Sequence, residues 1–135
     1  MKITAYVASA FSKNHEGGNK AGVVFMTQPL TRTQKMAIAK ELGFAETAFI
    51  SDSKIADFRL EYFTPKEEVD LCGHATIGAF TIMNHLNKLL QTAYTIETNS
   101  GLLAITANGE QLFMEQTVPT FYDTLTLEEL SGCFD

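Results

Sequence analysis

The sequence has little of what marks a nucleic-acid-binding protein. It carries 10 lysines and arginines against 16 aspartates and glutamates, for a formal net charge of -6, and its basic residues occur singly. Phosphate backbones are bound by concentrated positive charge. We therefore expect no nucleic acid among its partners.

Long hydrophobic runs and an export signal are also absent. No apolar segment reaches the roughly 20 residues that cross a bilayer, and the first residues alternate between polar and apolar types instead of resembling a signal peptide. The 2 cysteines, Cys72 and Cys133, have no metal-ligand spacing. We therefore expect no membrane partner, and free thiols in a reducing cytoplasm.

What the sequence does contain fits one globular domain. At 135 residues, with 45% hydrophobic and 19% charged residues, it is long enough for a single core. Alternating segments predict about seven strands, and two longer periodic segments predict helices, which together indicate an α+β fold. The expected strands cover residues 1–8, 23–26, 45–51, 58–63, 94–98, 102–107 and 111–116.

Turn and cap residues divide these segments. Residues 9–22 are rich in turn formers and predict a loop. Thr31 with Gln34 predicts a capping box at the start of a helix that Gly43 would end. Asn108-Gly109 predicts a tight hairpin.

Residues 69–78, VDLCGHATIG, place a thiol, a glycine and an imidazole before an apolar segment. This segment, residues 75–90, is apolar on nearly every side and predicts a buried helix. The first N–H groups of a buried helix need partners, and its dipole favours an anion there. The stretch predicts an anion pocket bordered by Cys72 and His74.

Cys72 and His74 each allow a chemical and a structural interpretation. A thiol at a helix N-terminus can act as a nucleophile or transfer a proton, but free cysteine is also a common space-filling residue in cores. His74 can act as a general acid or hold a substrate carboxylate, or it can bond to a backbone carbonyl. The residues alone leave both questions open.

Glu46 and Asn19 are the remaining candidates. Glu46 lies between small residues, where partial desolvation would make it a base near neutrality; an exposed glutamate at a strand start is the alternative. Asn19 either hydrogen-bonds a ligand or occupies a left-handed turn position. No His, Asp or Glu pair has metal-ligand spacing, so we expect no metal site.

Three motifs together are more specific than these residues taken singly. They are Gly18-Asn19-x-Ala21-Gly22-Val23-Val24, Ala45-Glu46-Thr47-Ala48-Phe49, and a run from Arg59 through Thr64-Pro65 to Cys72-Gly73-His74-Ala75-Thr76. In their order and spacing, the chain resembles the PhzF-like (phenazine biosynthesis-like) isomerase family over practically its whole length.

The resemblance implies a fold and a reaction. The family has the diaminopimelate epimerase fold, with two similar lobes, each a curved mixed sheet wrapped around a central buried helix, and an active site between them. Its members need no cofactor and transfer a proton at carbon. The resemblance implies an N-terminal lobe over residues 1–118, and a connection over residues 119–135 to a second lobe that is absent.

The resemblance also implies roles for single residues. Glu46 matches the catalytic acid/base, and His74 matches the histidine that assists it or binds substrate. Gly73 and the adjoining N–H groups of Ala75 and Thr76 would hold the carboxylate of a small substrate.

Two further residues would line the same cleft. Asn19 matches a loop asparagine of the family. Cys72 falls where related epimerases and racemases carry a catalytic cysteine, but it ranks behind Glu46 as the base.

The expected function is therefore half of a cofactor-independent isomerase, completed by a separate chain or by a homodimer. The alternative is a non-catalytic truncated or split-gene lobe that dimerises or binds a small metabolite. Chain boundaries set by cloning or proteolysis stay open as well, and the sequence does not identify the substrate.

Overall fold

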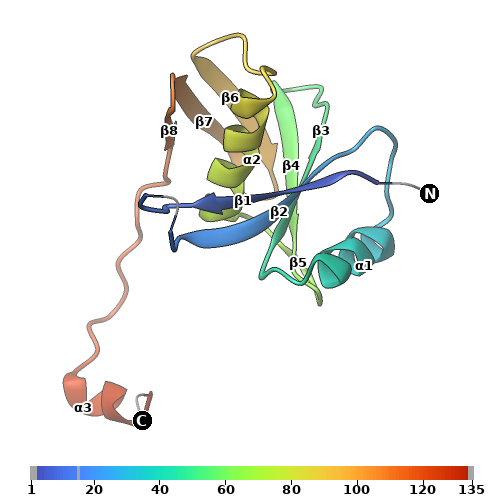
Figure 1. Cartoon of the computed structure of the whole chain (residues 1–135). Coiled ribbons are helices and arrows are strands. Elements are labelled where there is room, and N and C mark those ends of the chain that lie inside the picture. Colours follow the sequence, from blue (N-terminus) through green and yellow to red (C-terminus); the bar gives the residue numbers. More distant parts are fainter. Residues whose placement is uncertain (1–2, 15, 134–135) are drawn as a thin grey trace.

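The computed structural model describes residues 3–14 and 16–133, and its centre is one sheet curled around a helix (Figure 1). The sheet has 8 strands: β1 (Ala5–Ala10), β2 (Asn19–Phe25), β3 (Thr47–Ser51), β4 (Phe58–Phe63), β5 (Glu68–Val69), β6 (Ala93–Thr98), β7 (Gly101–Asn108) and β8 (Gln111–Met114). The helices are α1 (Arg32–Leu42), α2 (Gly73–His85) and α3 (Leu127–Leu130), and a 3₁₀ turn follows at Ser131–Cys133.

The sheet is mixed and runs in the order β1-β2-β3-β4-β6-β7-β8, with the short β5 paired to β4. The β2–β3 and β4–β6 pairs are parallel, and the other pairs are antiparallel. Strands from both ends of this order, β1, β2 and β8, contact α2. The predicted α+β lobe, a curved mixed sheet around a buried helix, is confirmed.

Every second side chain along the strands points inward, and these apolar side chains form the core around α2. In β7 the residues Leu103, Ile105 and Ala107 are buried while their neighbours face outward. From α2, Phe80 is fully buried and packs edge-on against Phe58 and at 5.8 Å from the ring of Tyr94. The stability of α2 thus comes from burial on several sides.

Helix α1 covers the outer face of the sheet, where a second apolar cluster contains Val24, Ala39, Phe49 and Phe63. Its predicted capping box at Thr31 is confirmed, and so is its left-handed C-cap at Gly43.

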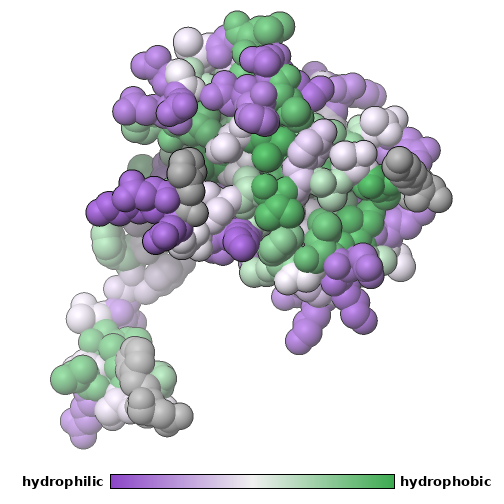
Figure 2. All heavy atoms as spheres, viewed as in Figure 1, coloured by the Kyte–Doolittle hydropathy of each residue, from purple (hydrophilic) through white to green (hydrophobic). Residues whose placement is uncertain are grey.

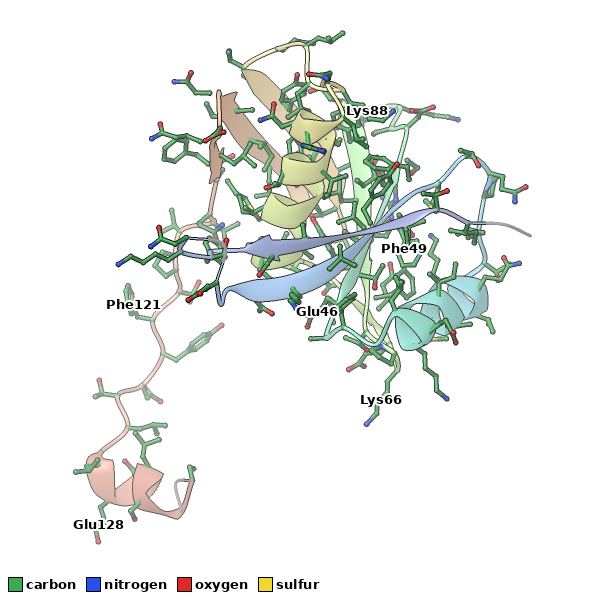
Figure 3. All side chains as sticks on the ribbon, viewed as in Figure 1. Glu46, Phe49, Lys66, Lys88, Phe121 and Glu128 are labelled. Atoms are coloured by element: carbon green, nitrogen blue, oxygen red, sulfur yellow. The ribbon has the colours of Figure 1, made fainter. Side chains whose placement is uncertain are left out.

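A buried ion pair fixes α1 to β4 on the same face. The Lys35 ammonium lies 2.6 Å from the Glu61 carboxylate and 5.5 Å from the centre of the Phe63 ring. In Figure 3 the labelled Phe49 lies between α1 and the sheet.

Two predicted boundaries are wrong. Residues 9–22 are not all loop, because β1 continues to Ala10 and pairs with β2 from Asn19 onward. Gly18 closes this hairpin: it has φ +77°, and a Cβ there would meet the Ala10 carbonyl oxygen at 2.5 Å. The helix predicted to reach Leu90 ends at His85, because Asn87 turns the chain with φ 53°.

The other expected strands are present to within a few residues, and the predicted β7–β8 hairpin is confirmed. Strands β6 and β7 also pair as an antiparallel hairpin. Of the first expected strand, Met1 and Lys2 lie outside the described residues. The 2-residue strand β5 was not expected from the sequence.

Beyond β8 the chain runs away from the sheet to α3 (Figure 1), and Thr126 caps this helix with its side chain. Large apolar residues of this segment are exposed, including Val118, Phe121 and Tyr122 at 88–89%. Figure 2 shows the end of this segment as a separate group of side chains with hydrophobic members. Within the described residues, no helix combines the length and apolar character needed to cross a membrane.

Candidate active site

The start of α2 is the centre of the site. Cys72 is the N-cap residue, with extended backbone, and its side chain makes no cap hydrogen bond. The first intrahelical bond runs from the Thr76 N–H to the Cys72 carbonyl. The N–H groups of Gly73, His74 and Ala75 precede that bond, so they belong to the helix end that lacks internal partners.

A buried chain of hydroxyl groups holds this helix start in place. The Thr76 hydroxyl donates to the Cys72 carbonyl oxygen at 2.7 Å, and the Tyr62 hydroxyl lies 2.6 Å from the Thr76 hydroxyl. Because the single Thr76 proton is already used, Tyr62 is the donor in this second bond. Tyr62 and Thr76 are both fully buried, and burial raises the pKa of Tyr62 far above its usual value, so it stays a donor.

The parallel β2–β3 pair positions Glu46. The Gly22 N–H donates to the Glu46 carbonyl oxygen at 3.1 Å, and Glu46 directly precedes β3. Because strand side chains alternate, Glu46 shares a face with Ala48, which belongs to the core around α2. Glu46 therefore points toward α2 and away from α1.

The Glu46 carboxylate approaches the His74 ring at 3.3 Å, measured from Oε2 to Nε2. The side chains are 24% and 13% exposed, respectively. This is an ion-pair distance without hydrogen-bond geometry, and His74 Nε2 is buried with no hydrogen-bond partner among the described residues. Figure 3 shows Glu46 near the end of α2 opposite Lys88.

The other ring nitrogen of His74 contacts Cys72. The Cys72 sulfur lies 3.3 Å from His74 Nδ1. One potential ligand atom from each of Glu46, Cys72 and His74 lies within 4.8 Å of the others, a grouping that sequence spacing did not reveal. However, the carboxylate and the sulfur approach different nitrogens of the ring, which point away from each other, so the three groups do not converge on one shared ion.

The Cys72 thiol is not activated by its place at the helix start. Burial is the largest influence on the pKa of this thiol and raises it. The backbone N–H of Ala75 comes next and lowers the pKa, the Glu46 carboxylate raises it, and the backbone N–H of His74 lowers it. The net pKa lies above the usual value, so the sulfur carries its proton at neutral pH. The thiolate that the sequence suggested for Cys72 is therefore not favoured.

The remaining predicted residues lie at different distances from this cluster. Gly73 is exposed beside it, whereas the side chains of Ala75 and Thr76 are fully buried. The backbone N–H of Ala75 remains at the helix end, but the N–H of Thr76 is used by Cys72. Asn19 is exposed at the start of β2, where it pairs with Ala10. Among the described residues, no hydrogen bond joins its side chain to Glu46, Cys72 or His74.

A groove of about 230 Å³ adjoins the site at Gly73, and the sequence did not indicate it. Phe11 forms part of it and has φ 59°, a rare conformation for a bulky residue. The complete lining is Phe11, Gly73, Ile77, Leu112, Phe113, Met114 and Gln116. Larger hollows lie around Met26 and Lys88, and none of the candidate residues lines them.

Comparison with known proteins shows which family this chain belongs to. A family described as "Phenazine biosynthesis-like protein" matches residues 8–130. The "Uncharacterized isomerase YddE" of Escherichia coli O157:H7 is 37% identical over 125 residues, which are 90% of this chain and 42% of that protein.

Solved structures of similar proteins share the fold. The PhzF-family phenazine biosynthesis protein of Bacillus anthracis has a TM-score of 0.80 and 38% identity, covering 91% of this chain and 44% of that one. A PhzF-family protein of Enterococcus faecalis has a TM-score of 0.81 at 28% identity, with 97% and 50% covered. The chain thus spans half or less of the length of these relatives.

Proposed function

Because this chain belongs to the phenazine biosynthesis-like protein family, we propose that it is one lobe of an isomerase that moves a proton between carbon atoms of a small carboxylate-bearing metabolite. The supporting observation is the 3.3 Å approach of Glu46 Oε2 to His74 Nε2 at the uncapped start of a buried helix. A base, a second proton carrier and an anion-binding helix end meet there.

Glu46 is the proposed acid/base. It takes a proton from a carbon next to the substrate carboxylate and returns it to another carbon, so that no atom is gained or lost. Its side chain is 24% exposed, so a substrate at the start of α2 can reach the carboxylate. His74 either donates a proton to the developing oxyanion or holds the substrate carboxylate.

The helix end is the proposed site for the substrate carboxylate. Free N–H groups and the positive end of the dipole favour an anion. When Glu46 removes the proton, negative charge spreads onto the carboxylate, and fixed N–H donors stabilise that charge without rearranging. Gly73 fits this place, since it is exposed and a side chain there would stand in the substrate's path.

We further propose that turnover needs a second lobe facing α2. Residues 119–135 would be the connection between lobes. Two observations favour a partner: Gly73 opens to solvent beside the groove, and Val118, Phe121 and Tyr122 are exposed. The same observations suit the second candidate, a non-catalytic lobe that dimerises or binds a metabolite.

The proposed binding site is tested by amide NMR of this chain during titration with acetate, with chloride at equal ionic strength as the control. Shifts should be confined to Gly73, His74 and Ala75 and the residues that touch them. The start of α1 is an internal comparison, because the Thr31 side chain already accepts from its Gln34 N–H. If the amide signals of Gly73 to Ala75 do not shift at millimolar acetate, the proposed binding site is excluded.

Catalysis is tested on the native assembly, whose mass is first measured by native mass spectrometry. A species near twice the 14.9 kDa of this chain, or a second chain of similar size, supports the completed isomerase. Such an assembly should exchange a carbon-bound proton of its substrate for deuterium in heavy water. A lone chain that binds acetate without any exchange supports the binding module instead.

A further inference from the structure

Cys72 has no part in the proton transfer just described, yet its sulfur lies 3.3 Å from His74 Nδ1. Glu46 Oε2 lies 3.3 Å from Nε2 on the opposite side of the same ring. The imidazole is therefore held between a thiol and a carboxylate, and each neighbour meets a different nitrogen.

The hydrogen positions follow from the chemistry of these neighbours. Burial keeps the thiol protonated, as its raised pKa indicates, so the sulfur offers one S–H donor. A neutral imidazole has one N–H and one nitrogen lone pair. An ionised carboxylate only accepts, so it is matched by Nε2–H, which leaves the Nδ1 lone pair for the thiol. The opposite tautomer would set a nitrogen lone pair against the carboxylate.

We propose that Cys72 is a positioning residue: its thiol donates to His74 Nδ1 and fixes the tautomer of the ring, with the hydrogen on Nε2, the nitrogen that lies nearest the Glu46 carboxylate. Because the thiol occupies the lone pair of Nδ1, the hydrogen of the ring stays on Nε2. Nε2 has no hydrogen-bond partner among the described residues, so its N–H is available to a substrate beside Glu46.

The backbone around Cys72 supports this arrangement. The hydroxyl chain from Tyr62 through Thr76 fixes the Cys72 carbonyl, and with it the residue that carries the sulfur. Among the described residues, the titratable groups that influence this thiol are Glu46, from the segment before β3, His74 on α2, and Tyr62 on β4. Tyr62 stays protonated, so it adds no charge beside the thiol.

The hydrogen on His74 is measured directly by NMR of this chain with labelled histidine at neutral pH. The wild type should give the signature of Nε2–H, with an unprotonated Nδ1. In Cys72→Ala the donor is lost, and the share of His74 rings that carry the hydrogen on Nδ1 should increase about threefold, as loss of one weak hydrogen bond implies. Cys72→Ser keeps a donor and should retain the wild-type signature.

Two controls make this test decisive. His85, exposed at the other end of α2, should give the same signals in all three proteins. The amide spectrum of α2 reports whether each variant is folded, and Cys72→Ser remains informative if the alanine variant is not. An Nδ1–H signature in the wild type, or a folded alanine variant with unchanged His74 signals, overturns the proposal.

The inference is tested separately from the proposed function on which its catalytic meaning rests. His74 can show the expected tautomer while acetate fails to shift Gly73 to Ala75, in which case only the proposed function fails. Acetate can also bind while His74 carries its hydrogen on Nδ1, and then only the role of Cys72 is lost.

Discussion

The two long helices begin in opposite ways. At the start of α1, the Thr31 side chain accepts from the Gln34 N–H at 3.3 Å, and the Gln34 side chain accepts from the Thr31 N–H at 2.8 Å. At the start of α2, Cys72 makes no side-chain cap bond. The capping box of α1 occupies the Gln34 N–H, whereas no side-chain cap bond occupies an N–H group in the first turn of α2.

Burial accounts for how α2 tolerates an uncapped start. The first turn of α1 is exposed, and a cap there contributes about 1 kcal/mol. Helix α2 is enclosed by β1, β2, β3 and β8 and buries Phe80 and Met83 completely. Side chains of this size contribute several times more than a cap. The core therefore stabilises α2 while its N-terminus remains available for a ligand.

The largest expected effect concerns the base at this free helix end. In the native assembly, Glu46→Gln should reduce deuterium exchange into substrate at least ~100-fold, because an amide cannot take up the proton. Mass spectrometry of the substrate measures the exchange. Glu41→Gln, an exposed change on α1, is the matched control and should leave the rate unchanged. A Glu46→Gln assembly with full exchange would exclude Glu46 as the base.

The next effect tests whether burial stabilises α2. Phe80→Ala removes a fully buried ring that contacts Phe58 and Tyr94, so it should lower the free energy of unfolding by about 3–5 kcal/mol. Met36→Ala on α1, where the side chain is only partly buried, should cost less. Urea denaturation of both variants measures the difference. Equal losses of stability in the two variants would contradict the conclusion that burial stabilises α2 more than α1.

Local signals in the sequence were sufficient for some features and not for others. The capping box at Thr31 and the hairpin at Asn108-Gly109 depend on neighbouring residues, and both are confirmed. The extent of β1 and β2 depends on their pairing, which short-range pattern does not contain. The end of α2 depends on Asn87 adopting a positive φ, although apolar residues continue beyond it.

The features of the site also divide into those that the local sequence predicts and those that depend on the fold. Cys72, Gly73 and His74 are adjacent in sequence, so their cluster at a helix start could be predicted from the motif. The approach of Glu46 to His74 could not be predicted from spacing, because it depends on the parallel β2–β3 pair and on the curl of the sheet around α2. Tyr62 was missed for the same reason, since its hydroxyl meets Thr76 only after β4 packs on α2.

A thiol probe separates the effect of the helix dipole from that of burial. An uncapped helix start alone would favour the Cys72 thiolate, but burial raises the pKa of this thiol. At neutral pH, Cys72 should react with iodoacetamide roughly tenfold more slowly than the exposed Cys133. Because a raised pKa moves thiolate formation to higher pH, the Cys72 rate should keep rising at alkaline pH. Peptide mapping by mass spectrometry measures both rates, and a faster Cys72 would show that the dipole outweighs burial.

The smallest expected effect is the most direct comparison of the two helix starts. Thr31→Ala removes the α1 cap and should lower the free energy of unfolding by about 1 kcal/mol, as measured by urea denaturation. Thr33→Ala is the matched control, because Thr33 is an exposed residue in the first turn of the same helix. This change should be nearly neutral or slightly stabilising.

The same variant shows whether an uncapped helix end is sufficient for binding. In Thr31→Ala, the Gln34 N–H of α1 loses its side-chain partner, yet this first turn lies in solvent with no counterpart of His74 beside it. Acetate should therefore still shift Gly73 to Ala75 and leave the start of α1 unchanged. If the uncapped α1 responded to acetate as strongly as α2 does, free N–H groups alone would explain the binding, and the Glu46–His74 pair would have no part in recognising a carboxylate.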